Sequence, residues 1–160
     1  MAALTLSTHG EIGRRAAGNN TWRCAQRHDM RYGTHNEDAM ANPAPGFLRK
    51  PDHTITLRQG VAASVSFGGV TVAVTRAAVM LEEVGYPPRA YIPRADIVAS
   101  LNETTKRTHC PFKGDTRYFA VSVEGAEVPD AAWTYPEPFD EMLPIAGLIA
   151  FDDRFSLSLE

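Results

Sequence analysis

Residues 61–75 read VAASVSFGGVTVAVT, a stretch in which apolar residues alternate with small or polar ones on both sides of a glycine pair. The alternating residues are Ala63, Val65 and Phe67 before Gly68-Gly69, and Val70, Val72 and Val74 after it. Alternation with a period of two is typical of a half-buried strand, and glycine readily adopts the positive φ of a tight hairpin turn. This stretch therefore predicts a β-hairpin and sets the class of the fold.

Other short runs along the chain also favour strands. They are residues 54–57, 91–92, 118–123, 131–135 and 148–151. Segment 77–84 is compatible with a short helix or an extended chain, residues 96–98 fit a helical turn, and residues 139–146 have helical spacing interrupted by Pro144. Because short strands dominate without a βαβ rhythm, we predict a mainly β fold, a compact antiparallel β domain with one or two short helices.

The first 41 residues differ in composition from the rest of the chain. They are rich in arginine, histidine and other polar residues and have no apolar period, so residues 1–41 are predicted to form a flexible N-terminal arm. An alternative is that translation starts at Met30 or Met40. Two prolines and a glycine in residues 42–46 disfavour helix and sheet alike and mark the boundary. Residues 42–160 are predicted to form a single β-rich domain.

Charge, hydropathy and cysteine content exclude several classes of protein. The formal net charge of −3 argues against nucleic acid as a partner. No apolar run approaches the roughly 20 residues of a membrane-spanning helix, and the N-terminus lacks the apolar stretch of a secretory signal. Cys24 and Cys110 are far apart in dissimilar contexts, so a disulfide framework is not expected. A reducing cytoplasm is therefore the expected location.

Several unusual elements follow one another between Asn42 and Phe151. They are Asn42-Pro43-Ala44-Pro45-Gly46, Gly85-Tyr86-Pro87-Pro88, Tyr91-Ile92-Pro93, Thr108-His109-Cys110-Pro111-Phe112-Lys113-Gly114-Asp115, Ala131-Ala132-Trp133-Thr134-Tyr135-Pro136-Glu137-Pro138, Ile145-Ala146-Gly147 and Ala150-Phe151. In this order and spacing the chain resembles the bacterial family called domain of unknown function 427. The resemblance implies a β fold of the Mss4-like or β-tent type, and the family carries a nucleotidyltransferase-like label.

The motifs of nucleotidyl transfer are not found in the sequence. Metal-dependent transfer needs carboxylates that converge on Mg²⁺, typically two residues apart on one strand. The acidic pair Asp152-Asp153 is placed at the end of a predicted strand, where neighbours would point to opposite faces. No Gly-x-x-x-x-Gly-Lys-Ser/Thr or Gly-x-Gly-x-x-Gly motif is present either. The sequence therefore leaves open whether the protein is an enzyme.

Metal and thiol chemistry both depend on Cys110, the single cysteine of the predicted domain. A structural zinc site needs four ligands at close spacing, so zinc is not expected, and no cofactor is predicted. A reactive thiol needs a nearby cation and a base. Lys113 could supply the charge, but in an extended segment the His109 ring would point away from the sulfur. A packed, unreactive thiol is the favoured alternative.

A ligand pocket is predicted around Lys113-Gly114, where an ammonium and a bare backbone can approach an anion together. A solvated turn is the alternative. Trp133 and Tyr135, two residues apart, would share one face of a strand and could stack a planar ligand or cap the core. His53 is predicted to be a solvated loop histidine. The family pattern adds four candidate ligand-binding residues: Arg76, Tyr91, Asp96 and Tyr118.

Three functions follow from these residues. The first is a small-ligand-binding domain, or an enzyme, whose pocket takes an anionic or planar molecule. The second is a non-catalytic interaction module that forms a homodimer through a β-edge. The third is thiol chemistry at Cys110. Weak catalytic candidates are Cys110, Lys113 and Asp96.

Overall fold

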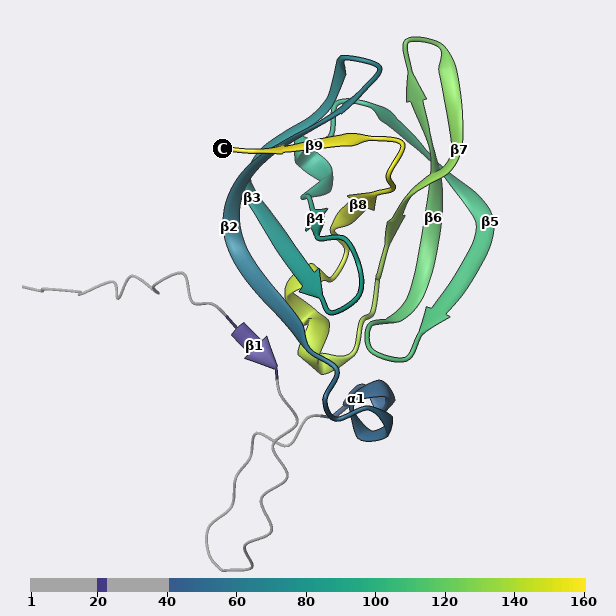
Figure 1. The fold of residues 1–160 in the computed structure, drawn as a ribbon. Coiled ribbons are helices and arrows are strands. Elements are labelled where there is room, and N and C mark those ends of the chain that lie inside the picture. Colours follow the sequence, from purple (N-terminus) through teal and green to yellow (C-terminus); the bar gives the residue numbers. More distant parts are fainter. Residues whose placement is uncertain (1–19, 23–40) are drawn as a thin grey trace, which may run out of the picture.

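The computed structural model describes residues 20–22 and 41–160, which form two antiparallel sheets (Figure 1). The strands of the first sheet, in spatial order, are β1 (Asn20–Trp22), β2 (Ile55–Phe67), β3 (Val70–Glu83) and β4 (Arg89–Tyr91), and β9 (Ser156–Leu159) also pairs with β2. The second sheet has the order β5 (Ser100–Cys110), β6 (Gly114–Val123), β7 (Ala126–Thr134) and β8 (Ile149–Phe151). This architecture confirms the prediction of a mainly β, antiparallel fold. The β-tent type stays a prediction.

The predicted hairpin is the long β2–β3 ribbon. Gly68 and Gly69 have φ of 57° and 86°, and Phe67 pairs with Val70 across the turn. The sequence did not distinguish a helix from an extended chain for segment 77–84. In the structure this segment is extended as far as Glu83, within β3. Residues 78–81 of this segment are buried on both faces of the ribbon, because the core has two parts. Ala78 and Met80 pack into one part of the core, whereas Val79 and Leu81 pack into the other.

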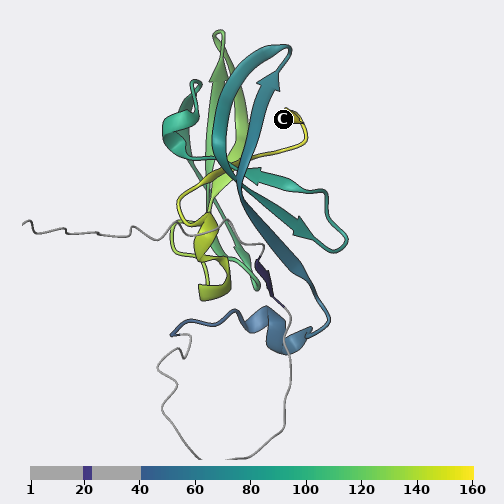
Figure 2. The ribbon, with the colours of Figure 1, turned by 90° about the vertical axis from the view of Figure 1, so that its left-hand side faces the viewer.

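The two sheets are joined where β4 meets β8. Ile92 and Ile149 exchange backbone hydrogen bonds of 2.8 and 2.9 Å. In Figure 1 the β2–β3 ribbon and the β5–β7 strands stand on opposite sides of this junction, and in Figure 2, seen from the left-hand side of Figure 1, the β2–β3 ribbon lies nearer the viewer. The larger apolar cluster fills the space near the β2–β3 turn, and the second cluster lies toward α1 (Pro45–Arg49) and the 3-10 helix η2 (Asp140–Ile145).

The segment predicted as a boundary without helix begins the short helix α1. That expectation was wrong, because Pro45 occupies the start of the helix, where a missing N–H costs nothing. The Gly46 amide donates to the Pro111 carbonyl at 2.8 Å, and Phe47 packs edge-on against Phe112. The buried Glu141 carboxylate accepts from the Ala44 amide at 2.9 Å. These contacts tie the boundary segment to the β5–β6 turn and to η2.

We expect Gly46→Ala to destabilise the protein by about 1–3 kcal/mol, the usual cost of overpacking. A Cβ at Gly46 would lie 2.6 Å from the Phe112 ring and 2.7 Å from the Pro111 carbonyl oxygen. Urea unfolding measures the effect. Leu48→Ala is the control, because this side chain of the same helix is 76% exposed and its loss should change stability by less than about 0.5 kcal/mol. Equal midpoints for the Gly46 variant and wild type would refute the clash.

The remaining sequence expectations have mixed outcomes. Residues 139–146 contain η2, a 3-10 helix with Pro144 inside, and a 3-10 turn, η1 (Arg94–Asp96), starts two residues before the predicted turn at 96–98. Strands β5 and β9 were not predicted. The predicted flexible arm, residues 1–41, lies outside the described residues except for Ala41 and β1. In the part of the chain that is described, no helix has the length and apolar character to cross a membrane.

Candidate functional site

A cleft of about 570 Å³ is bounded by residues of both sheets, of the end of α1 and of the β5–β6 turn. Six of the side chains predicted as site residues contribute to its walls. They are Tyr91, Cys110, Lys113, Tyr118, Trp133 and Tyr135. Residues from distant parts of the sequence therefore meet in one concave site, as the ligand-pocket hypothesis requires.

Four aromatic side chains form the main wall of the cleft. Tyr118 and Trp133 are direct partners across β6 and β7, with ring centroids 6.4 Å apart. Trp133 and Tyr135 both line the cleft, as their spacing predicted. The buried Tyr91 ring lies 6.4 Å from Tyr135, and its hydroxyl accepts a long hydrogen bond of 3.4 Å from the Trp133 indole. Burial raises the pKa of the Tyr91 and Tyr135 phenols above their ordinary value, so both stay protonated.

Two cations lie over this aromatic wall. The Lys106 ammonium is 4.3 Å from the centroid of the Tyr118 ring, and the Arg89 guanidinium is 5.7 Å from the centroid of Trp133. Both distances are within the range of cation–π attraction. Arg89 also donates to Asp153 at 2.6 Å. Lys106 and Arg89 were not predicted as site residues.

Lys113 lines the cleft but its ammonium is already bound. It donates to Glu83 at 2.5 Å, and the two side chains are only 8% and 9% exposed. The second Glu83 oxygen is 2.9 Å from His53 Nε2, and the His53 ring stacks on Phe112 at 4.1 Å. The expectation that His53 is a solvated loop residue was therefore wrong. A lysine neutralised in this way is a structural part of the wall rather than an open anion contact.

Cys110 is half-buried at the end of β5, and its neighbour His109 turns away from it. His109 instead lies 2.7 Å from Asp115, its partner across the β5–β6 turn. This placement agrees with the expectation that His109 does not serve the Cys110 thiol. In residues 41–160, no side-chain hydrogen bond is formed between Cys110 and a base.

Arg76 and Asp96 do not line the cleft. Arg76 is exposed on β3. Asp96, at the end of η1, accepts a hydrogen bond of 2.6 Å from the Thr75 hydroxyl. This bond ties η1 to β3, so the structure gives Asp96 a contact between two elements and separates it from the aromatic wall.

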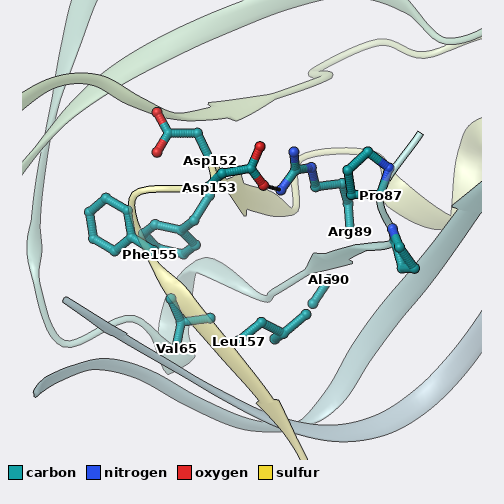
Figure 3. A pocket seen from close by; sticks show the side chains of 10 residues that line it. Val65, Pro87, Arg89, Ala90, Asp152, Asp153, Phe155 and Leu157 are labelled. Atoms are coloured by element: carbon teal, nitrogen blue, oxygen red, sulfur yellow. Dashed lines mark hydrogen bonds and ion pairs between the residues drawn. The ribbon is translucent and has the colours of Figure 1, made fainter. Parts of the chain in front are cut away.

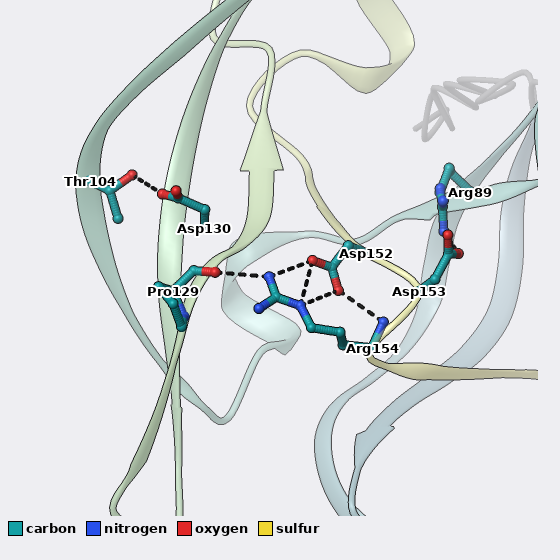
Figure 4. A network of polar contacts seen from close by, with 7 residues as sticks. All are labelled: Arg89, Thr104, Pro129, Asp130, Asp152, Asp153 and Arg154. Carbon is teal, nitrogen blue, oxygen red and sulfur yellow. Dashed lines mark hydrogen bonds and ion pairs between the residues drawn. The ribbon is translucent and has the colours of Figure 1, made fainter.

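The acidic pair Asp152-Asp153 follows β8 in a turn rather than on a strand, which corrects the sequence expectation. Each of the two carboxylates is bound by a different arginine (Figure 4). Asp152 accepts from Arg154 at 2.6 Å, and Arg89 binds Asp153 and lowers the pKa of that carboxyl. The two carboxylates therefore do not converge. Among residues 41–160, no group of three or more His, Cys, Asp or Glu side chains is arranged to hold a metal ion.

A smaller hollow of about 140 Å³ adjoins the cleft beside Arg89 (Figure 3). Pro87, Arg89 and Asp152 contribute to the walls of both spaces. Its other walls are mostly apolar, with Val65 and Phe155 among them. Sites for small molecules occupy about 300–1,000 Å³. The cleft, and not this hollow, is therefore the candidate ligand site.

Comparison with known proteins gives one match at the level of a family. No curated protein matches the chain. The family model NTP_transf_9, described as "Domain of unknown function (DUF427)", matches residues 56–158. This range is more than half of the chain and includes every wall residue of the cleft except Lys50 and His53. The chain therefore belongs to the DUF427 family.

Proposed function

We propose that this protein binds a small, planar, negatively charged molecule in the cleft between its sheets. The cleft volume of about 570 Å³ lies within the range of roughly 300–1,000 Å³ that is usual for such sites. Aromatic walls with a few polar groups are also typical of them. The shape and the lining together support binding of one small molecule.

The observation that carries the proposal is the pairing of each ring with a cation. Tyr118 lies under Lys106, and Trp133 lies under Arg89. When a cation moves aside to meet the carboxylate or phosphate of a planar ligand, the ligand can stack on the ring face that the cation leaves. This combination favours a ligand that has a flat ring system and an anionic group.

The charges around the cleft support an anion in spite of the net charge of −3. Of the four cationic wall residues, Lys113 is neutralised by Glu83 and Arg89 is paired with Asp153. Lys50 and Lys106 take part in no salt bridge within residues 41–160. Two lysines are therefore available for an anion, against one wall carboxylate, Asp130, that also forms no salt bridge among these residues.

Nucleotides and aromatic carboxylates both have the required chemistry. Nucleotidyl transfer would in addition need carboxylates that converge on Mg²⁺, and residues 41–160 contain no group of three or more His, Cys, Asp or Glu side chains arranged to hold a metal ion. Ligand binding is therefore the function we propose. The β-edge homodimer and thiol chemistry at Cys110 remain predictions from the sequence, and no contact among the described residues favours either.

A thermal-shift screen with nucleoside monophosphates and aromatic carboxylates tests the proposal, because a ligand of the native state raises the melting temperature by mass action. For the best compound, we expect Trp133→Ala to weaken binding by about 5- to 150-fold, the range expected for a lost stacking contact. Lys106→Ala should weaken it by roughly fivefold and make it less sensitive to salt.

Arg76→Ala is the matched control, because Arg76 is an exposed cation outside the cleft. It should leave binding unchanged. Trp133→Phe is a second variant in case Trp133→Ala does not fold. Its smaller aromatic ring preserves an aromatic surface in the cleft wall and should retain part of the affinity. Unchanged affinity in both the Trp133→Ala and Lys106→Ala variants, when both are folded, would reject the cleft as the binding site.

A further inference from the structure

A second hollow, of about 330 Å³, lies on the opposite face of the β5–β8 sheet from the cleft. Neighbouring residues of a strand point to opposite faces. Tyr118 and Trp133 line the cleft, whereas the adjacent Arg117 and Thr134 line this second hollow. The two spaces are therefore separated by the thickness of the sheet and have different walls.

Thr134 has a buried hydroxyl without a partner. The residue is 6% exposed, and its Oγ1 accepts and donates no hydrogen bond among the described residues. Buried polar groups are nearly always hydrogen-bonded, so an exception calls for a physical explanation. A ligand that accepts a hydrogen bond from this hydroxyl would remove the free-energy cost of burying it without a partner.

Two arginines line the same hollow. Arg117 lies directly across from Thr134 in the register of β6 and β7, and the two side chains are therefore neighbours on one face. Arg94, at the start of η1, is 5.2 Å from the centroid of the Phe119 ring. Neither arginine forms a salt bridge within residues 41–160. The guanidinium groups are thus available to an anion.

The one carboxylate in the walls of this hollow does not cancel these charges. Glu103 is bound to Arg107 at 2.6 Å. Phe119, Leu101 and Ile149 supply apolar surface beside the arginines. The hollow therefore combines two cations, one unpartnered hydroxyl and an apolar floor.

We propose that this hollow binds the carboxylate or phosphate group of a small organic molecule, at a site separate from the cleft. Arginine recognises both groups through paired N–H donors. Arg117 is exposed and lies beside Thr134. In this proposal the guanidinium of Arg117 and the neighbouring Thr134 hydroxyl both donate to the anion, while Phe119 and its neighbours contact the apolar part of the ligand.

Inorganic phosphate and acetate are the probes, titrated at constant ionic strength and followed by amide chemical shifts in the full chain. We expect saturable shifts at Arg117 and Thr134, with a dissociation constant on the order of 1 mM for these minimal ions. Tighter phosphate binding assigns a phosphorylated ligand, and tighter acetate binding assigns a carboxylate. Arg117→Ala should weaken the tighter ion about tenfold, whereas Arg58→Ala, an exposed arginine on β2, should not.

Thr134→Val separates a ligand contact from a merely structural role. Because it removes a buried hydroxyl that has no partner, it should raise the melting temperature of the free protein by roughly 2–4 °C. It should also weaken anion binding severalfold. A lower melting temperature would show that the hydroxyl has a partner and would overturn the proposal, as would equal affinities of the Arg117→Ala and wild-type proteins. Trp133→Phe should leave this binding unchanged, so failure of the cleft proposal would not affect it.

Discussion

Glu83→Gln will destabilise the protein by about 3–5 kcal/mol, the cost of leaving a buried charge without its partner. The Lys113 ammonium nitrogen lies 2.5 Å from a carboxylate oxygen of Glu83, and the two side chains are 8% and 9% exposed. The amide that replaces the carboxylate cannot neutralise the Lys113 ammonium, and hydrogen bonds hold the Lys113 backbone on both sides. The Lys113 backbone N–H donates to the Cys110 carbonyl, and the Lys113 carbonyl accepts from the Phe139 N–H. Urea unfolding at neutral pH measures the difference.

Removing both charges should cost far less than removing one. In the double variant Glu83→Gln with Lys113→Met no unpaired charge is left, and methionine fills most of the lysine volume. We expect the double variant to recover at least half of the lost stability. Glu82→Gln is the control. The Glu82 carboxylate is next to Glu83 in the sequence but is exposed, so it should contribute less than about 1 kcal/mol to stability. Equal free energies of unfolding for the Glu83→Gln and Glu82→Gln variants would show that the buried Glu83–Lys113 pair does not stabilise the protein.

The Glu83–Lys113 pair also shows how far the sequence predicts the site. The motif around Lys113 led to a segment that lines the cleft, because the unusual element from Thr108 to Gly114 carries the family resemblance. The partner is 30 residues away, at the end of a segment whose secondary structure was ambiguous. Since no local pattern connects Glu83 to Lys113, the sequence could not show that the lysine is already neutralised.

Alternation located strands but did not fix which side chains are buried, since Val74 is 55% exposed and its neighbour Ala73 is buried. The Gly68-Gly69 hairpin and the strand from Tyr118 to Val123 were found in this way. Strand β5 was missed because it lies at the edge of its sheet and most of its residues are exposed and polar. Strand β9 was missed because all four of its residues are exposed. In both, backbone pairing to a neighbouring strand outweighs the side-chain pattern.

The aromatic wall was predicted from its residues, whereas its cations were not. Trp133 and Tyr135 could be placed on one face from their spacing alone. Lys106 and Arg89 belong to segments without a binding motif, and they reach the wall only because the two sheets meet. Arg76 and Asp96 matched the family's polar pattern but lie elsewhere. A family pattern therefore identified some positions that connect elements rather than form the cleft.

Alkaline conditions will destabilise the protein through Tyr91 and Tyr135. Burial raises the pKa of both phenols above the ordinary value of 10.0. In the unfolded chain both ionise near pH 10, while the folded state keeps them protonated. The stabilising difference is fully present below about pH 10 and is lost as the pH rises above it, by about 1.4 kcal/mol per pH unit for each tyrosine. The two together give a slope of about 3 kcal/mol per pH unit.

Urea unfolding at several pH values above neutrality measures this slope, and phenolate absorbance follows the ionisation. Tyr91→Phe and Tyr135→Phe should each remove about half of the slope, whereas Tyr86→Phe, whose side chain is 66% exposed, should leave it unchanged. The absorbance of the two buried phenolates should appear together with unfolding, because neither ring can release its proton while it lies in the apolar wall. Phenolate formation by both tyrosines in the folded protein would show that burial does not raise their pKa values, and it would contradict the predicted loss of stability above pH 10.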